Sequence, residues 1–119
     1  MEQSSLTKGA SAAETVYLGT PEDIPNWMAL VESVRNLFPG LDTPEQLEKH
    51  KNTVLRFMER REAICTKYEE KITGTLLFSR EQNIICFLAV SAEYRRRGIG
   101  AALLTQALYF CKQILLYFL

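Results

Sequence analysis

The sequence predicts one α/β domain, in which a mixed, mostly antiparallel sheet is flanked by helices on both faces. Two observations indicate this class. Apolar residues between positions 27 and 38 recur every three or four residues, as on one face of a helix, whereas after Arg61 they alternate with period two, as in a strand. The length of 119 residues and the 47% hydrophobic content are sufficient for a single buried core.

Residues 1–14 are predicted to form a mobile tail, because they are polar, rich in small residues and lack the apolar core of a secretion signal. The domain is therefore expected to occupy residues 15–119. It begins with a short strand at residues 15–18, where Thr and Tyr alternate with Val and Leu.

Two capped helices are predicted to follow this strand. Thr20 is placed to cap the first helix, which ends at Pro39-Gly40. Thr43 begins the second helix, Gln46 completes its capping box, and the helix is expected to run to about Arg60. The first helix buries one apolar stripe, made of Trp27, Leu30, Val31, Val34, Leu37 and Phe38.

Three consecutive antiparallel strands are expected after the second helix. Residues 63–68 and 72–78 flank a polar turn and form a hairpin, and residues 84–90 follow a second turn. The third strand, Ile-Ile-Cys-Phe-Leu-Ala-Val, is apolar on both faces. We therefore expect it to be central and covered by helices on both sides.

A closing helix is predicted from Gly98 to Gln113. Leu104 is expected on its apolar face, whereas the opposite face carries Thr105, Gln106, Tyr109, Lys112 and Gln113. This polar stripe does not continue into the apolar run at residues 114–119, where the sequence stops.

The loop between the third strand and the closing helix has the sequence Arg95-Arg96-Arg97-Gly98-Ile99-Gly100. Its glycines are spaced Gly-x-Gly, so successive backbone N–H groups can turn inward where a side chain would otherwise block the approach. A Rossmann loop needs a third glycine, but position 103 is Leu, and the Gly-Lys-Ser/Thr of a P-loop is absent. The loop is typical of a cradle for a diphosphate.

These residues resemble the Arg/Gln-x-x-Gly-x-Gly/Ala signature of the GNAT N-acetyltransferases, which also lies between a strand and a helix. The resemblance extends from about Thr15 to about Gln113 and includes the helical N-terminal half and the hairpin. Members of the family continue with a further strand, a helix and more strands. The chain therefore looks like a C-terminally shortened GNAT domain or a fragment of one.

The resemblance implies that acetyl-coenzyme A is the co-substrate. Backbone amides at the start of the closing helix would bind its diphosphate. The backbone of the preceding strand would hydrogen-bond the pantetheine arm like an added strand. The expected cofactor-binding residues are Leu88, Ala89, Val90, Arg95, Arg96, Arg97, Gly98, Ile99, Gly100 and Ala101.

The resemblance also implies direct transfer of the acetyl group to a primary amine of a small molecule or peptide. The ammonium must lose a proton before attack, and the leaving thiolate must gain one. In the family a tyrosine beyond the present C-terminus commonly supplies this acid, so no catalytic residue is assigned. Glu70 and Glu93 are expected to be solvated turn carboxylates, and His50 a surface residue.

The acceptor amine is not identified by the sequence. The connection between the first two helices lines the substrate site in relatives, so Pro39, Gly40 and Leu41 are weak candidates for a substrate wall. For Trp27 and Phe38, core packing is the favoured role.

The shortened chain leads to two expectations. In the family the cofactor arm lies in a V-shaped gap between the strand equivalent to residues 84–90 and the next strand, which is absent here. We therefore expect weak cofactor binding with poor turnover, and dimerisation or aggregation through the uncovered strand edge. The alternative function is a non-catalytic acyl-CoA-binding or interaction module of the same fold.

Composition argues against other classes. The 14 basic and 14 acidic residues balance, so no bulk field attracts nucleic acid or an anionic membrane. A C-terminal membrane anchor is disfavoured because polar residues occupy one stripe of the closing helix. Cys65, Cys86 and Cys111 lie in apolar patterns, as small buried hydrophobes do, and lack metal-binding spacing. No metal is expected, and the favoured location is a reducing cytoplasm.

Overall fold

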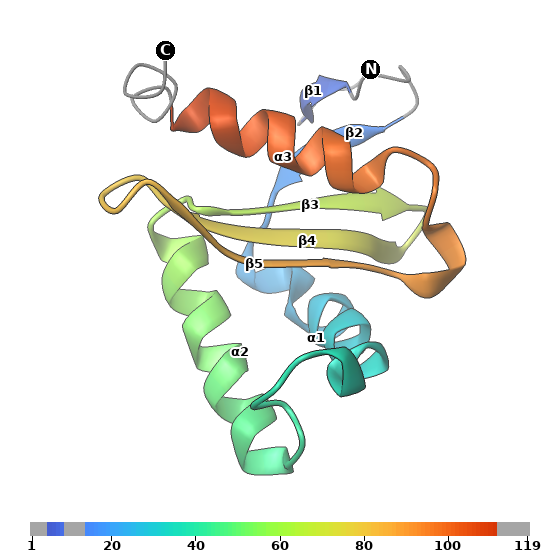
Figure 1. The fold of residues 1–119 in the computed structure, drawn as a ribbon, viewed down its shortest axis with the longest axis vertical. Helices are drawn as coiled ribbons and strands as arrows, with labels where there is room; N and C mark the ends of the chain where they lie inside the picture. The colour runs from blue at the N-terminus through green and yellow to red at the C-terminus, as the bar shows by residue number, and fades with distance from the viewer. Residues whose placement is uncertain (1–4, 9–13, 112–119) are drawn as a thin grey trace.

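The computed structural model describes residues 5–8 and 14–111, which form a sheet between two helical layers (Figure 1). Helix α3 (Ile99–Phe110) covers one face, and helices α1 (Ile24–Ser33) and α2 (Pro44–Glu59) cover the other. The strands are β1 (Ser5–Lys8), β2 (Thr15–Leu18), β3 (Ala63–Tyr68), β4 (Lys71–Ser79) and β5 (Ile84–Val90). Short 3-10 turns lie at Pro21–Asp23, Arg35–Leu37 and Ala92–Tyr94.

The described sheet is antiparallel, with its strands in the order β1-β2-β3-β4-β5. The predicted α/β class, with helices on both faces, is confirmed. β5 has the predicted bounds but lies at an edge of the described sheet, not at its centre. Ile84 and Ile85 are 45% and 36% exposed, whereas Ala89 is buried. An apolar pattern indicates that the two faces of a strand are covered, but it does not indicate which strands pair with its two edges. For this reason the pattern did not predict the edge position of β5.

β1 lies in the segment for which the sequence predicts a mobile tail. Its Thr7 pairs with Val16 of β2, across a register irregularity. The prediction is therefore wrong for residues 5–8, whereas residues 1–4 and 9–13 lie outside the described residues. Backbone N–H and C=O groups form the ladder, so a polar segment can add an edge strand that side-chain patterns do not reveal.

The first helix is shorter than predicted. α1 ends at Ser33, and the chain continues through a 3-10 turn in which the Leu37 N–H donates to the Val34 carbonyl at 2.9 Å. Leu37 is exposed, so its predicted place in the buried stripe is wrong. After the turn, the ring centroid of Phe38 lies 4.7 Å from that of Phe87 on β5.

The second helix begins as predicted. The Thr43 hydroxyl accepts a hydrogen bond from the Gln46 N–H at 3.1 Å, and the Gln46 side-chain oxygen accepts one from the Thr43 N–H at 3.1 Å. This capping box satisfies two backbone donors that the helix leaves unpaired. The helix ends at Glu59, and its Val54 and Met58 are buried in the core.

The closing helix packs through a different face from the one predicted. Gln106, expected on the polar stripe, is only 4% exposed, whereas Leu104 is 37% exposed. The buried face includes the small residues Ala102 and Ala107, which let the helix lie close to the sheet. The prediction weighed the size of apolar side chains, but the closeness of packing decides the face. The last predicted turn of this helix lies outside the described residues.

The closest approach of α3 to the sheet is made at Gly74 of β4. A Cβ atom on Gly74 would lie 2.6 Å from Cγ2 of Ile99 and 3.0 Å from Cδ1 of Leu103. Since both distances are too short for carbon atoms, glycine is needed for the helix to rest here. Gly74 pairs with Val90, the last residue of β5, so this contact places the start of α3 beside the end of β5.

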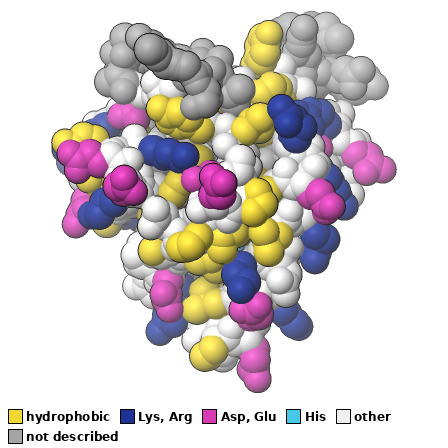
Figure 2. Space-filling view, turned by 180° about the vertical axis from the view of Figure 1, so that it is seen from behind, with side chains coloured by type: hydrophobic (Ala, Val, Ile, Leu, Met, Phe, Trp, Pro, Cys, Tyr) yellow, Lys and Arg dark blue, Asp and Glu magenta, His cyan; other side chains and the backbone are white. Residues whose placement is uncertain are grey.

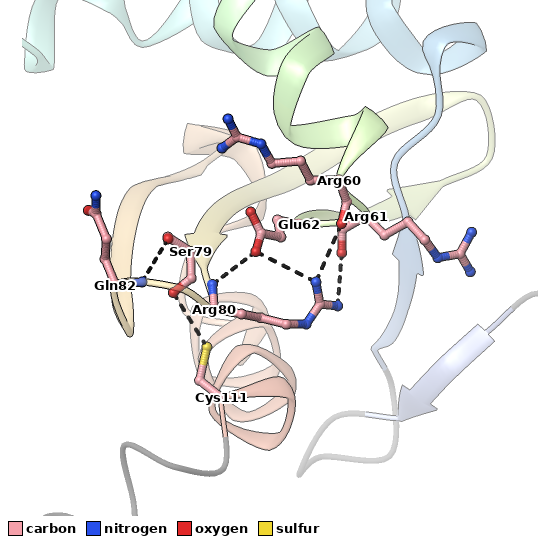
Figure 3. A network of polar contacts seen from close by, with 7 residues as sticks. All are labelled: Arg60, Arg61, Glu62, Ser79, Arg80, Gln82 and Cys111. Carbon is pink, nitrogen blue, oxygen red and sulfur yellow. Dashed lines mark hydrogen bonds and ion pairs between the residues drawn. The ribbon is translucent and has the colours of Figure 1, made fainter.

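A buried carboxylate joins the elements at the opposite end of the sheet (Figure 3). Glu62 accepts a hydrogen bond from the Arg80 backbone N–H at 2.9 Å and lies 3.6 Å from Nη1 of its guanidinium. The guanidinium also donates to the carbonyls of Arg60 and Arg61. It lies 5.4 Å from the ring centroid of Phe110, so the network connects the end of α2, the β4–β5 turn and the end of α3.

We expect Gly74→Ala to lower the free energy of unfolding by about 1–3 kcal/mol, because the added methyl group overpacks the contact with Ile99 and Leu103. Urea denaturation followed by circular dichroism measures the change. Gly100→Ala is the matched control, since a Cβ there meets no atom within 4 Å. The control should be neutral or stabilising by up to about 1 kcal/mol. Equal stability of Gly74→Ala and the wild-type chain would show that α3 does not depend on this glycine.

Candidate functional site

The predicted order of strand, loop and helix is confirmed, and two backbone hydrogen bonds hold the start of the loop. After β5, the Ser91 N–H donates to the Thr73 carbonyl on β4 at 2.9 Å. The Tyr94 N–H donates back to the Ser91 carbonyl at 3.0 Å and closes a turn. The chain then reaches α3 through residues 95–98.

The backbone of this last segment alternates in handedness. Arg96 has a φ of 67° and Gly98 a φ of 81°, and the residue between them is outside the left-handed region. Left-handed residues allow successive N–H groups to turn toward one side, as they do in the nests that bind anions. A residue other than glycine in the left-handed region costs on the order of 1 kcal/mol or more, and residues like Arg96 cluster at binding sites for that reason.

The start of α3 has unpaired backbone donors. Its N-cap, Gly98, has no side chain, and the Gly98 carbonyl accepts the first helical hydrogen bond from Ala102 at 2.9 Å. The preceding amides of Ile99, Gly100 and Ala101 donate to no described residue. A Cβ on Gly100 would meet no atom within 4 Å, so its glycine is not required by packing in the described protein. Three N–H groups at the positive end of the helix dipole are therefore without a partner among the described residues, which suits an anion.

The arginines of the loop contact the protein itself. Arg95 Nε donates to the Val90 carbonyl at 3.3 Å and draws the loop toward β5. The Arg97 guanidinium lies 5.1 Å from the ring centroid of Tyr94. Burial raises the pKa of Glu14, and the charge of Arg97 opposes that shift. Arg97 therefore lies near the Glu14 carboxylate. The unpartnered backbone amides, rather than a cluster of guanidinium groups, are thus the feature of the loop that suits an anion.

The outer edge of β5 has no partner strand within residues 5–8 and 14–111. Its inner edge pairs with β4 through Leu88, Ala89 and Val90. Leu88 and Val90 pack in the cluster under α3, and Ala89 packs in the cluster under α1 and α2. Among the described residues this backbone edge therefore lacks a partner strand, although the Val90 carbonyl accepts a hydrogen bond from Arg95, and the side chains support the core.

A cavity of about 420 Å³, here called the His50 cavity, lies beside the connection between α1 and α2. The sequence-based candidates Phe38 and residues 39–41 line this cavity, whereas Trp27 is fully buried in the core. His50, expected at the surface, is half-buried, with its ring centroid 4.7 Å from that of Phe87. Nothing in the polar pattern around His50 indicated this contact, because it depends on where β5 lies. The lining residues are Phe38, Pro39, Gly40, Leu41, Gln46, Lys49, His50, Thr53 and Phe87.

The two acidic residues considered as bases are exposed, as predicted. Glu93 forms an ion pair with Lys71, with 3.3 Å between its carboxylate and the ammonium nitrogen. Glu70 uses its backbone carbonyl to accept a hydrogen bond from Asn26 at 2.8 Å. Neither carboxylate lines the His50 cavity.

The three cysteines are free thiols that are held protonated. Burial raises the pKa of Cys65 to about 12 and also raises the pKa values of Cys86 and Cys111. Cys65 and Cys111 are buried as predicted, whereas Cys86 is exposed at a bulge of β5 opposite β4. A thiol that stays protonated is a poor nucleophile.

The described ranges, 5–8 and 14–111, contain neither a candidate metal site nor a candidate membrane span. No group of three or more His, Cys, Asp and Glu side chains there is placed to hold a metal ion. No helix in these ranges is both long and apolar enough to span a bilayer.

Solved structures of acetyltransferases share this fold at low sequence identity. A GCN5-related N-acetyltransferase from Kribbella flavida has a TM-score of 0.67 and 14% identity, with 82% of this chain and 26% of that chain covered. A GNAT-family acetyltransferase from Bacillus cereus has a TM-score of 0.58 and 18% identity, with coverage of 80% and 62%. The PaiA N-acetyltransferase of Thermoplasma acidophilum, solved in complex with coenzyme A, has a TM-score of 0.62 and 15% identity, with coverage of 85% and 73%.

The chain spans about a quarter of the Kribbella protein and less than two thirds of the Bacillus protein. A search of curated proteins finds no significant match. The model of the acetyltransferase (GNAT) family, however, matches residues 27–118, which is more than half of the chain. The match includes β5, the loop with its two left-handed residues and the uncapped start of α3. The chain belongs to the GNAT acetyltransferase family.

Proposed function

We propose that this chain binds acetyl-coenzyme A and transfers its acetyl group directly to a primary amine of a small molecule or peptide. The observation that carries the proposal is the uncapped start of α3, where three amides have no partner among the described residues and the space beside Gly100 is open. Family membership supports the same reaction class. The Thermoplasma relative of the same fold was solved with coenzyme A, which supports the choice of ligand.

The diphosphate is assigned to the first turn of α3 and to the nest that precedes it. A helix N-terminus carries roughly half a positive charge, and its free N–H groups form charge-assisted hydrogen bonds with phosphate oxygens. These donors are held by the backbone, so binding requires little ordering of side chains. The residues involved are Arg95, Arg96, Arg97, Gly98, Ile99, Gly100 and Ala101.

The pantetheine arm is assigned to the open edge of β5. Its amide groups can pair with the backbone of Leu88, Ala89 and Val90 as an added strand does. From Val90, beside the diphosphate site, the strand leads back over about 10 Å to Phe87. Because Phe87 lines the His50 cavity, the thioester end of the arm would lie beside this cavity.

In direct transfer the acetyl group passes from the thioester to the amine, and no covalent acetyl–protein intermediate is formed. The amine nitrogen forms a bond to the thioester carbonyl carbon, and the C–S bond breaks with its electron pair staying on sulfur. Of the three ammonium protons, one leaves to a base before attack, one passes to sulfur and one stays on the amide. Acetylation of a cysteine is disfavoured, because burial raises the pKa of Cys86, the cysteine adjacent to Phe87.

A non-catalytic acyl-CoA-binding or interaction module is the second candidate function. It is favoured by one observation, namely that the carboxylates near the loop, Glu70 and Glu93, are exposed and lie outside the cavity. An acetyltransferase releases thiol from acetyl-CoA in the presence of an acceptor amine, whereas a binding module does not. Binding without thiol release would favour the module.

The remaining proposals concern location and partners. Figure 2 shows Lys and Arg side chains interspersed with Asp and Glu on the face seen from behind, and this mixture supports a protein without a nucleic-acid or membrane partner. Free thiols at Cys65, Cys86 and Cys111 support a cytoplasmic location.

Gly100→Glu is expected to weaken coenzyme A binding by at least about tenfold while the fold is retained, because a carboxylate enters the open space and repels the diphosphate. Titration calorimetry with coenzyme A measures the affinity. Thr105→Glu adds the same charge at an exposed position of the same helix and should leave the affinity unchanged. Wild-type affinity in a folded Gly100→Glu variant would exclude this site.

We also propose that two copies of the chain associate through the open edge of β5, because unpaired backbone groups on an edge template pairing with another strand. Ile85→Lys should reduce this association by placing a charge in the paired edge, and light scattering measures it. Coenzyme A should reduce it too, because its arm would occupy the same edge at Leu88–Val90. Thr105→Lys is the control. A wild-type chain that stays monomeric when concentrated would contradict the proposal.

A further inference from the structure

The His50 cavity is built from three parts of the fold. The connection between α1 and α2 supplies Phe38 and Leu41, α2 supplies His50, and β5 supplies Phe87. The rings of Phe38 and His50 each lie 4.7 Å, centroid to centroid, from the ring of Phe87. An aromatic wall therefore holds the only imidazole of the chain beside an open space large enough for a small ligand.

The two ring nitrogens of His50 differ in their surroundings. Nε2 is enclosed and has no hydrogen-bond partner. Nδ1 is not among the enclosed unpartnered atoms, and His50 lines the cavity, so we assign Nδ1 as the nitrogen that meets a ligand there. When the neutral ring carries its proton on Nε2, the lone pair of Nδ1 is free to accept another.

The surroundings favour the neutral ring. Burial lowers the pKa of His50 from its ordinary value of 6.5. Lys49 is the charged side chain among the lining residues, and neither the α1–α2 connection nor Phe87 of β5 presents a titratable group to the cavity. With no carboxylate in the lining to stabilise an imidazolium, the neutral form of His50, which has a free lone pair, is favoured.

The position of the cavity matches the end of the proposed cofactor path. Phe87 directly precedes Leu88, the first residue of the edge assigned to the pantetheine arm. Phe87 and Ala89 pack on the same side of β5, the side covered by α1 and α2. An amine bound against Phe87 would therefore meet the thioester from the face of the sheet opposite to α3.

We propose that His50 accepts a proton from the acceptor ammonium in this cavity and so frees the amine lone pair for attack. The inference rests on the proposed acetyl transfer. Nδ1 forms the new N–H bond, directly or through one water, and the imidazolium later releases that proton to solvent. The nitrogen of the amine keeps two protons, one of which passes to sulfur when the C–S bond breaks.

The same lining defines the class of acceptor. Two phenylalanine rings and Leu41 offer apolar contact, while Lys49 repels additional positive charge. The cavity therefore fits a primary amine with an apolar or aromatic body better than a polyamine. 2-Phenylethylamine and spermidine represent these two classes.

Histidine NMR tests this proposal without requiring turnover. Because the chain has one histidine, its imidazole carbon Cε1 gives a single resonance. We expect this resonance to titrate below pH 6.5 and to shift when 2-phenylethylamine is added, but not with spermidine. Lys51→Gln, on the same helix but outside the lining of the cavity, should retain the shift with 2-phenylethylamine. If the chemical shift of this resonance does not change when 2-phenylethylamine is added, the proposal is overturned.

The rate of thiol release as a function of pH provides the second test. In the wild-type chain, kcat/KM should fall as the pH drops through the pKa of His50. His50→Gln keeps a polar side chain but cannot accept the proton, so this acidic limb should vanish and kcat should fall on the order of 100-fold. Lys51→Gln, outside the cavity, should keep this limb. If the His50→Gln variant keeps the acidic limb of the pH–rate profile, His50 is not the proton acceptor.

Calorimetry separates this inference from the function on which it rests. His50→Gln should bind coenzyme A as the wild-type chain does, because His50 lies outside the diphosphate site and the β5 edge. If the wild-type chain binds no coenzyme A, the proposed acetyl transfer fails. The response of the imidazole to 2-phenylethylamine then decides whether His50 binds amines at all.

Discussion

The contact between α3 and Gly74 determines where the functional backbone lies. Ile99 and Leu103 rest on the sheet at a point where any side chain would push the helix away. This contact sets the first turn of α3, which carries the unpartnered amides, beside the end of β5. At the other end of the helix, Arg80 lies over Phe110 while it is held by Glu62. The helix is thus held at both ends.

β5 links the two faces of the sheet. Its Leu88 and Val90 support α3, whose first turn carries the unpartnered amides. Its Phe87 faces the other layer and forms the aromatic wall of the His50 cavity. The backbone edge between these features is open in the described sheet. One strand therefore relates the proposed diphosphate site to the proposed acceptor site, and the spacing follows from the rise of the strand.

Local features were predictable from the sequence. The capping box of Thr43 and Gln46, the bounds of β5 and the glycine loop before α3 depend on neighbouring residues, and all were found where expected. Features that depend on distant segments were not. The burial of Gln106 follows from how closely α3 approaches the sheet, and the contact of His50 with Phe87 joins a helix to a strand far along the chain.

The proposal that the start of α3 binds the diphosphate is tested most directly by the amide NMR spectrum of the full chain during titration with coenzyme A. The account predicts that the largest shifts fall on the amides of residues 96–101, with smaller shifts along Leu88–Val90. Desulfo-coenzyme A, which keeps the diphosphate, should produce the same pattern at the loop. Shifts confined to other parts of the chain, with residues 96–101 unaffected, would contradict the account.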